Sequence, residues 1–204
     1  MIGIIDYGAG NLQSVEKALR HIGCNCRVVD NPVALADCAG AVLPGVGAFG
    51  EAMAGLRARG LDVAIKRYIA GERPFLGICL GLQVLFESSE ETPGVPGMGV
   101  LPGKILRLPE DRGLKVPHIG WNSLCLSQPG WLLAGLPAEP YVYFVHSYYL
   151  QAPQELVTAT ASYGACIHTA VERGNLVACQ FHPEKSGTVG LDILRNFAGR
   201  VQED

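Results

Sequence analysis

Charged residues are scarce in this 204-residue sequence. They make up 17% of it, and 16 Lys and Arg against 19 Asp and Glu leave a net charge of −3. Aromatic residues make up only 7%, and no basic run is interleaved with them. A groove that binds nucleic acid needs a basic patch of that kind. We therefore expect no nucleic-acid partner.

The sequence also lacks an export signal and any apolar run long enough to cross a bilayer. Its seven cysteines are scattered, and none stands in the Cys-x-x-Cys spacing of zinc or redox sites. The group His21, Cys24 and Cys26 comes nearest to a metal site, but no second pair of ligands accompanies it. We expect a cytoplasmic protein with free thiols, no membrane contact, no metal and no cofactor.

What is abundant is apolar residues. They make up 49% of the chain, and the mean hydropathy is +0.22. This composition excludes disorder, and the length suits one domain with a sizeable core. No repeat or hydrophilic linker divides the sequence, so residues 1–204 are expected to form a single domain. The Pro- and Gly-rich stretch Thr92 to Gly103 is interpreted as surface loops that could hold a mobile flap.

The apolar patterns alternate between strand and helix in the first half of the chain. Within the first expected helix, Asn11 is a candidate N-cap and Gly23 a left-handed stop. The expected strands are Ile2 to Ile5, Arg27 to Val29, Ala41 to Leu43, Phe75 to Ile78, Ile105 to Leu108, Tyr141 to Tyr149 and Leu176 to Gln180. The expected helices are Leu12 to Ile22, two pieces from Glu51 to Ala70 with a break at Gly60, one from near Leu80, and Leu191 to Phe197. The pattern predicts an α/β three-layer sandwich, with a largely parallel central sheet and an antiparallel extension.

One segment combines a strand, a cysteine between glycines, and a helix. Gly77-Ile78-Cys79-Leu80-Gly81 follows an apolar strand and precedes a helical pattern, which is the arrangement of a nucleophile elbow. The glycines leave room for a sharp turn with strained angles at the nucleophile. The helix N-terminus favours a thiolate at Cys79. The alternative is a buried cysteine at a glycine-rich strand end.

A partner base stands near the C-terminus. His182 follows an apolar strand, and Glu184 comes two residues later, after Pro183. In an extended segment, residues two apart point the same way, so the glutamate could orient the imidazole while the imidazole takes the thiol proton. The other candidate bases are His118, His146 and His168, which as isolated residues are more typical of structural histidines.

Together, Gly77-Ile78-Cys79-Leu80-Gly81-Leu82-Gln83 and His182-Pro183-Glu184 resemble the class I, triad-type glutamine amidotransferases. Further segments resemble one branch of that family, the glutaminase subunits of imidazole glycerol phosphate synthase. They are Ile5 to Asn11, Leu43 to Phe49, His118 to Asn122, Tyr143 to Tyr149 and Phe181 to Gly187. The resemblance implies a flavodoxin-like fold and hydrolysis of glutamine to glutamate and ammonia in histidine biosynthesis.

The resemblance also implies roles for individual residues. Cys79 would attack the glutamine amide, His182 would move the proton, and Glu184 would orient His182. The implied oxyanion donors are backbone N–H groups of Leu80 and of the segment Val46 and Gly47, and the implied glutamine-binding residues are Gly47, Gln83, Ser147 and Tyr148.

A partner is implied as well. In this family the ammonia passes to a (β/α)₈-barrel cyclase, and the present chain is too short to include a barrel of about 250 residues. We therefore expect a heterodimer, with Asn11, Tyr143 and Lys185 as candidates for its interface and gate. The alternatives for Asn11 and Lys185 are a helix cap and a solvated charge.

Three alternatives compete with this interpretation. Gly8-Ala9-Gly10 after the first strand, with Asp30 after the second, resembles a dinucleotide-binding turn, but Gln13 replaces the third glycine. A cysteine hydrolase for other amides, or a glutaminase of another synthase, would keep the elbow and change its use. A non-catalytic interaction protein would keep only the fold.

Overall fold

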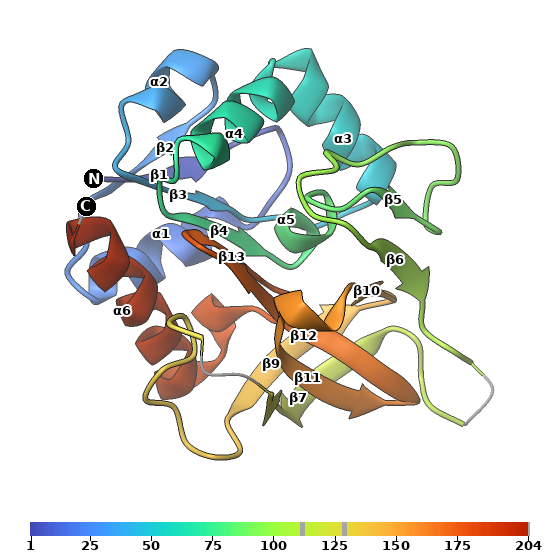
Figure 1. Ribbon diagram of the computed structural model, residues 1–204. Coiled ribbons are helices and arrows are strands. Elements are labelled where there is room, and N and C mark those ends of the chain that lie inside the picture. Colours follow the sequence, from blue (N-terminus) through green and yellow to red (C-terminus); the bar gives the residue numbers. More distant parts are fainter. Residues whose placement is uncertain (111–112, 128–129, 204) are drawn as a thin grey trace.

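The computed structural model describes residues 1–110, 113–127 and 130–203 (Figure 1). The predicted domain, 1–204, therefore includes five residues, 111–112, 128–129 and 204, that lie outside the described part. The elements of the first half are β1 (Ile2–Ile5), α1 (Leu12–His21), β2 (Cys26–Val29), α2 (Pro32–Ala36), β3 (Gly40–Leu43), α3 (Phe49–Ala58), α4 (Leu61–Ala70), β4 (Phe75–Ile78), α5 (Leu80–Gln83) and β5 (Ser88–Ser89).

The second half of the chain is mostly β-structure. Its elements are β6 (Lys104–Arg107), β7 (His118–Ser123), β8 (Cys125–Leu126), β9 (Tyr141–His146), β10 (Tyr148–Gln151), the 3₁₀ turn η1 (Gln154–Leu156), β11 (Val157–Tyr163), β12 (Ala165–Arg173), β13 (Leu176–Cys179), the 3₁₀ turn η2 (Pro183–Lys185) and α6 (Gly187–Glu203).

The main sheet has eleven strands, and its central path runs β2-β1-β3-β4-β13-β12-β10-β6-β5. The first five strands of this path are parallel to one another. From β13 onward the pairing changes to antiparallel, through β12, β10 and β6. The order of the parallel part is that of doubly wound folds of the flavodoxin type. The predicted parallel sheet with an antiparallel extension is confirmed.

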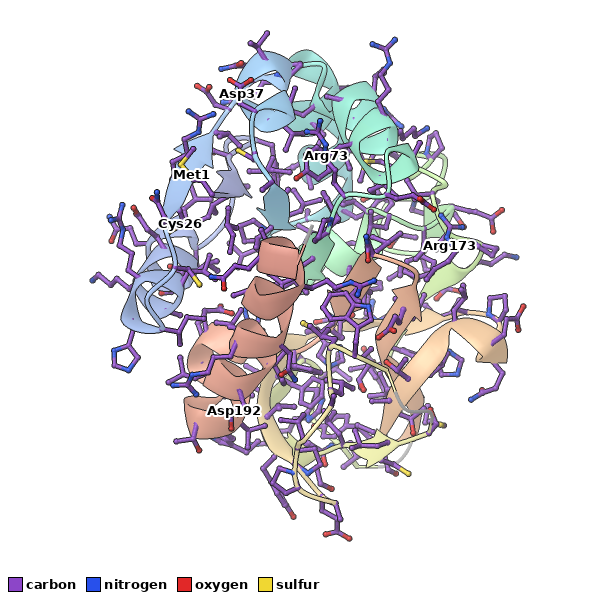
Figure 2. All side chains as sticks on the ribbon, turned by 60° about the vertical axis from the view of Figure 1, so that its left-hand side comes forward. Met1, Cys26, Asp37, Arg73, Arg173 and Asp192 are labelled. Carbon is purple, nitrogen blue, oxygen red and sulfur yellow. The ribbon has the colours of Figure 1, made fainter. Side chains whose placement is uncertain are left out.

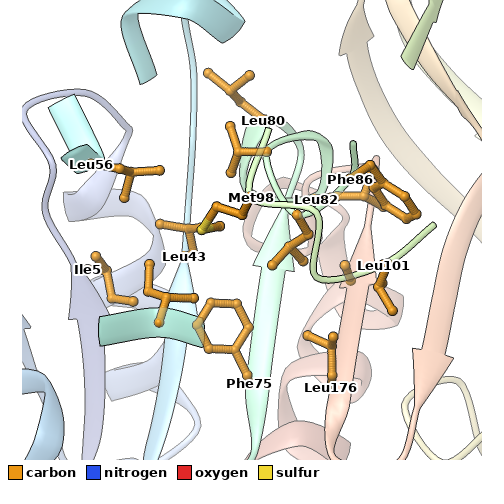
Figure 3. Close-up of a cluster of buried hydrophobic side chains, with 14 of the residues drawn as sticks. Ile5, Leu43, Leu56, Phe75, Leu80, Leu82, Phe86, Met98, Leu101 and Leu176 are labelled. Carbon is orange, nitrogen blue, oxygen red and sulfur yellow. The ribbon is translucent and has the colours of Figure 1, made fainter. Parts of the chain in front are cut away.

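Helices cover both faces of the parallel strands, as Figure 1 shows. One hydrophobic cluster lies between the sheet and α2, α3 and α4, and Figure 3 shows part of it, including Leu43, Phe75 and Leu176. A second cluster lies between the opposite face, α1 and α6. Adjacent residues of one strand pack into different clusters, because successive side chains in a strand point to opposite faces of the sheet. Charged side chains such as Asp37, Arg73, Arg173 and Asp192 lie on the outside (Figure 2).

Local signals marked several element ends correctly. Gly23 follows α1 with φ 85°, and Gly60 separates α3 from α4 with φ 65°. Asn11 occupies the N-cap position of α1, but its side chain makes no capping hydrogen bond. The helix predicted at Leu191 to Phe197 is longer, from Gly187 to Glu203.

Three expectations need correction. The predicted strand Tyr141 to Tyr149 is two strands, because the chain leaves the small sheet with β7 at His146 and joins the main sheet at Tyr148. The helix after the elbow has four residues only. The stretch Thr92 to Gly103 is not only surface loop, since Met98 and Leu101 are buried in the core. In the described ranges, no helix is long and apolar enough to span a membrane.

Candidate active site

Cys79 stands at the turn between β4 and α5 with φ 55° and ψ −109°. Only Glu72 shares a positive φ among the described non-glycine residues. Such angles are costly for a residue with a Cβ and persist only where the surroundings impose them. The strained turn expected from the elbow sequence is therefore present at Cys79.

The flanking glycines are required by contacts with the backbone. A Cβ on Gly81 would lie 1.8 Å from the carbonyl oxygen of Leu43, and one on Gly77 would lie 2.8 Å from that of Gly81. A Cβ on Gly45 would lie 2.7 Å from Cβ of Leu80. These close approaches bring the segment after β3 directly against the turn that carries Cys79.

Sheet pairing brings His182 to the same place. Strand β13 pairs in parallel with β4, with Cys179 opposite Ile78, and the Cys79 N–H donates to the carbonyl of Cys179 at 2.8 Å. The carboxyl ends of neighbouring parallel strands share one edge of the sheet, where open α/β folds place their ligands. Residues far apart in sequence, Cys79 and His182, therefore meet at one edge.

Glu184 contacts the ring of His182 from behind. Its Oε1 lies 2.8 Å from Nδ1 of His182, and the two side chains are only 1% and 2% exposed. The contact was expected, but the local geometry was not. Pro183–Lys185 form a 3₁₀ turn in place of the extended segment that we assumed.

The environment of His182 favours its charged form. Burial lowers its pKa, but hydrogen bonding and charge interactions with Cys79 and Glu184 outweigh burial and raise the pKa to about 10. Apart from the thiol, Nε2 of His182 meets no hydrogen-bond partner in the described part of the chain. The imidazole of His182, between the Cys79 sulfur and the Glu184 carboxylate, is therefore placed to take the thiol proton and to carry it as an imidazolium.

A pocket of about 290 Å³ opens on this cluster. Most of the residues expected in the site contribute to its wall, whereas Glu184 lies behind His182. The lining residues are Val46, Gly47, Cys79, Leu80, Gln83, Glu91, Pro117, Val145, His146, Ser147, Tyr148 and His182. Glu91, Pro117, Val145 and His146 were not expected there.

Gln83 reaches this pocket from α5. Its Nε2 donates to the carbonyl of Tyr148 at 3.1 Å and to Oε1 of Gln180 at 3.0 Å. Gln180, which is completely buried, places its own Nε2 3.6 Å from Sγ of Cys79. Sequence reasoning missed Gln180, although a glutamine that follows an apolar strand two residues before the candidate base is a usable signal.

Two of the alternative bases form a buried pair beside the pocket. Nδ1 of His118 lies 3.2 Å from Nε2 of His146, whose Nδ1 lies 2.9 Å from the carbonyl of Tyr148. Burial lowers the pKa of both to about 4, and for His146 the charges of His118 and His182 add to it. His168 lies elsewhere, where its Nδ1 accepts from the backbone N–H of Ala152. The pair is neutral at pH 7 and holds the Tyr148 backbone.

The three candidates for an interface do not form one cluster of contacts. Lys185 Nζ lies 5.9 Å above the ring of Tyr143, which makes an edge contact with Trp121. The backbone carbonyl of Tyr143 accepts from the backbone N–H of His182 at 3.0 Å. Tyr143 therefore links Lys185 and Trp121 to the candidate base. Asn11 lies at the start of α1.

Within the described residues, the structure does not form the alternative dinucleotide-binding and metal sites. The Gly8 turn is occupied by Arg59, whose guanidinium donates to the carbonyl of Tyr7 and would lie 3.2 Å from a Cβ on Gly8. In the part of the chain that the structure describes, no group of three or more His, Cys, Asp or Glu side chains could hold a metal ion. Cys26 directs its thiol to the carbonyl of Glu16.

Comparison with known proteins decides among the remaining interpretations. The model of the family "Glutamine amidotransferase class-I" matches residues 3–201. The imidazole glycerol phosphate synthase subunit HisH of Desulfitobacterium hafniense is 49% identical over 205 residues, covering 100% of this chain and 96% of that protein. The HisH subunit of Methanothermobacter thermautotrophicus is 51% identical over 197 residues, covering 97% of each chain. The chain belongs to the HisH family of class I glutamine amidotransferases.

Solved structures agree on the fold. A crystal structure of a glutamine amidotransferase superposes on this amidotransferase with a TM-score of 0.77 at 20% identity, covering 98% of both chains. PurLQS from Thermotoga maritima gives 0.77 at 18% identity, covering 97% of both. At these identities the likeness shows the fold alone, and it confirms the fold class expected from the sequence.

Proposed function

We propose that this chain hydrolyses glutamine through a thioester on Cys79, as the glutaminase subunit of an imidazole glycerol phosphate synthase. The observation that carries the proposal is the arrangement of Cys79 and His182 at the wall of one pocket, with Glu184 behind His182. Family membership supports the reaction, and the geometry supports the assignment of roles to these residues.

The roles follow from the protonation preferences of the groups. The Cys79 thiol gives its proton to Nε2 of His182, and the thiolate sulfur attacks the side-chain carbonyl of glutamine. His182 then protonates the departing amine, so that the C–N bond breaks and ammonia leaves. In the second half, His182 removes a proton from water, hydroxide attacks the thioester, and glutamate and the thiol are released. Glu184 holds the ring and stabilises its positive charge.

The oxyanion of each tetrahedral intermediate needs N–H donors. Leu80 begins α5 directly after the nucleophile, and its N–H is assigned as the first donor. The second comes from the segment Val46 and Gly47, which lines the pocket opposite. Gly47 has φ 101° and no atom within 4 Å of where its Cβ would be, so this backbone has room to turn a peptide.

Glutamine is assigned to the space between these donors and β10. Gly47, Gln83, Ser147 and Tyr148 surround it. Their backbone groups and the Gln83 amide offer both donors and acceptors to an amino acid, which carries an ammonium and a carboxylate besides the reacting amide.

The partner is assigned to the small sheet β7-β9. Ile119, Trp121 and Tyr141 are all more than half exposed there. They alternate along their strands, and Trp121 pairs with Tyr143, so one face of this sheet is apolar and open. Lys185 lies at that face, one turn from His182. We assign to it a separate (β/α)₈-barrel cyclase, with Tyr143, Lys185 and Asn11 at the contact.

With that partner, ammonia joins a ribonucleotide to give imidazole glycerol phosphate and aminoimidazole carboxamide ribonucleotide in histidine biosynthesis. The names of the HisH relatives support this pathway. We further propose that the chain acts as one domain in the cytoplasm, without cofactor.

The test is glutamate release from glutamine by the chain alone and with the cyclase and its ribonucleotide. We expect strong stimulation by the partner with ligand bound. Glutamate release that does not change when this partner is added would be consistent with the Cys79 chemistry and would place the chain in another pathway. Full retention of activity in Cys79→Ser would exclude the proposed nucleophile.

A further inference from the structure

The carbonyl oxygen of Tyr148 sets the direction of several hydrogen bonds around the pocket. A backbone carbonyl only accepts, and this one lies 3.1 Å from Nε2 of Gln83 and 2.9 Å from Nδ1 of His146. Both partners must therefore be donors. This fixes which end of the Gln83 side-chain amide is the nitrogen, without reference to any ligand.

The orientation of the Gln83 amide in turn fixes the orientation of the Gln180 amide. Since the Gln83 nitrogen also contacts the Gln180 side chain at 3.0 Å, the contacting atom of Gln180 must be its oxygen. The amide nitrogen of Gln180 is then the atom that faces Sγ of Cys79, at 3.6 Å. The sulfur consequently receives an N–H group from Gln180 and not its carbonyl oxygen. The thiol also contacts the backbone carbonyl of Val145, to which it can donate at 4.0 Å.

Gln180 is held firmly in this position. Its side chain is fully buried, and its backbone N–H donates to the carbonyl of Thr169 at 2.8 Å. Burying a primary amide is costly unless its donors and acceptor are satisfied. Here one polar contact is to Gln83 and the other is to the nucleophile, so the satisfaction of Gln180 depends on the site.

We propose that Gln180 stabilises the Cys79 thiolate by donating an amide N–H to Sγ and orients the side chain of Gln83 for glutamine binding. The inference rests on the proposed nucleophilic role of Cys79. A hydrogen bond to a charged acceptor is stronger than one to a neutral acceptor, so this donor favours the thiolate over the thiol.

The second part of the proposal concerns specificity. Both contacts of Gln83 Nε2 are to protein oxygens. Oε1 is therefore the polar side-chain atom of Gln83 that can bind a ligand in the pocket. Oε1 accepts hydrogen bonds only, so it selects for an N–H donor of the substrate. Gln180 is thus a positioning residue for an acceptor that recognises the ammonium or amide of glutamine.

The test compares Gln180→Leu and Gln180→Glu in the complex with the cyclase partner. We expect Gln180→Leu to lower kcat about ten- to hundred-fold, through loss of a charge-assisted hydrogen bond, and to raise KM for glutamine. The alkylation of Cys79 by iodoacetamide should require a higher pH than in the parent chain. At pH 8 the kcat of Gln180→Glu should be lower than that of Gln180→Leu, since a carboxylate repels the thiolate. At lower pH, where the carboxylate is protonated, the kcat of Gln180→Glu should rise relative to that of Gln180→Leu.

The matched control is Gln151→Leu, the same change at an exposed position of β10. It should leave the alkylation profile, kcat and KM unchanged. A purely structural role of Gln180 would lower the thermal stability of its variants without shifting the pH profile of alkylation, and that result would overturn the proposal.

A measurement on the unaltered chain avoids any folding defect. Glutamine side chains labelled with ¹⁵N give NH₂ signals, and those of Gln180 should shift as Cys79 ionises and should not do so in Cys79→Ala. Signals of Gln180 that ignore Cys79 ionisation would refute the proposed bond. If Cys79→Ser kept full activity, the proposed function would fail; if Cys79→Ser were inactive and Gln180→Leu behaved as the parent, only this inference would fail.

Discussion

Nδ1 of His182 lies 2.8 Å from Oε1 of Glu184, in a contact from which solvent is almost excluded. The carboxylate fixes the ring so that its other nitrogen, Nε2, is directed to the thiol side. It also helps raise the pKa of His182 to about 10 against the effect of burial. A charged, oriented imidazole beside Cys79 is the basis of the first prediction.

Glu184→Gln should lower kcat for glutamate release about 10²- to 10⁴-fold, the range known for the third member of hydrolase triads. It should also lower the pKa of His182, because the negative charge is lost while the burial remains. Histidine NMR titration in the complex measures that pKa. Glu155→Gln, at an exposed position, is the control. An unchanged titration of His182 in Glu184→Gln would contradict the assigned role.

Removal of the nucleophile should separate two activities. In Cys79→Ala, glutamine-dependent synthesis should disappear, while the complex should still form imidazole glycerol phosphate from added ammonium salts. The reason is that the cyclase reaction needs ammonia and not Cys79. Assays with glutamine and with ammonium chloride distinguish the two. Loss of the ammonium-dependent reaction as well would show that the two sites are not separate.

The elbow glycines provide a stability test. Gly81→Ala places a Cβ 1.8 Å from the Leu43 carbonyl oxygen and should cost more than about 3 kcal/mol of unfolding free energy. Gly199 lies in α6 with no atom within 4 Å of its would-be Cβ. Gly199→Ala should therefore stabilise the chain by about 0.5–1 kcal/mol. Denaturant unfolding of both variants checks the difference, and equal effects would contradict the packing described.

The buried histidine pair predicts loss of stability in acid. The pKa values of His118 and His146 are about 4 in the folded chain, against about 6.5 when unfolded. Between these pH values the unfolded chain binds more protons, so each histidine lowers the free energy of unfolding by ~1.4 kcal/mol per pH unit as the pH falls. His182 acts oppositely, because its pKa is raised and its stabilising contribution is lost as the pH rises from about 6.5 through 10.

Unfolding measured from pH 4.5 to 6.5 tests this. His118→Phe keeps an aromatic ring between Phe144 and Tyr163 and should have a shallower dependence on pH than the parent. His21→Phe, an exposed position, should not change the dependence. A slope in His118→Phe equal to that of the parent would exclude the buried pair as its source.

The apolar face of the small sheet predicts where the partner binds. Trp121→Ala should weaken the affinity for the cyclase by about 2 kcal/mol or more, as for aromatic residues at the centre of interfaces. Val33→Ala removes a side chain that is also exposed, on α2, and should leave the affinity unchanged. Calorimetric titration of the cyclase measures both. Equal affinities of the parent and Trp121→Ala would move the interface elsewhere.

Local patterns were sufficient for the strands of the parallel sheet and for the elbow. The periodic apolar runs of β1, β3 and β4 are buried on both faces, and Gly77 and Gly81 mark a turn that no other residue fits. The same patterns did not lead us to β11 and β12, although Gly164 between them and Gly174-Asn175 after β12 are usable turn signals. Nor could they show that the predicted strand Tyr141 to Tyr149 changes sheets near Ser147.

The site residues that could be predicted from sequence are those with a reactive side chain in a recognisable local motif. Cys79 and His182 are recognisable in sequence, since each follows an apolar strand and bears a reactive group. Gln180 bears no reactive group, and its position before His182 does not show that it contacts Cys79, because that contact spans 101 residues and depends on the pairing of β4 with β13. The His118 and His146 pair likewise arises only when β7 lies against β9.

The most direct test of the central claim is covalent labelling by a glutamine analogue that carries a diazoketone in place of the amide. The complex would be inactivated with it in the presence of the cyclase and its ribonucleotide, digested, and mapped by mass spectrometry. The account predicts one adduct, on Cys79, that excess glutamine prevents and that His182→Asn slows strongly. Inactivation with the label on another residue, or with Cys79 unmodified, would contradict it.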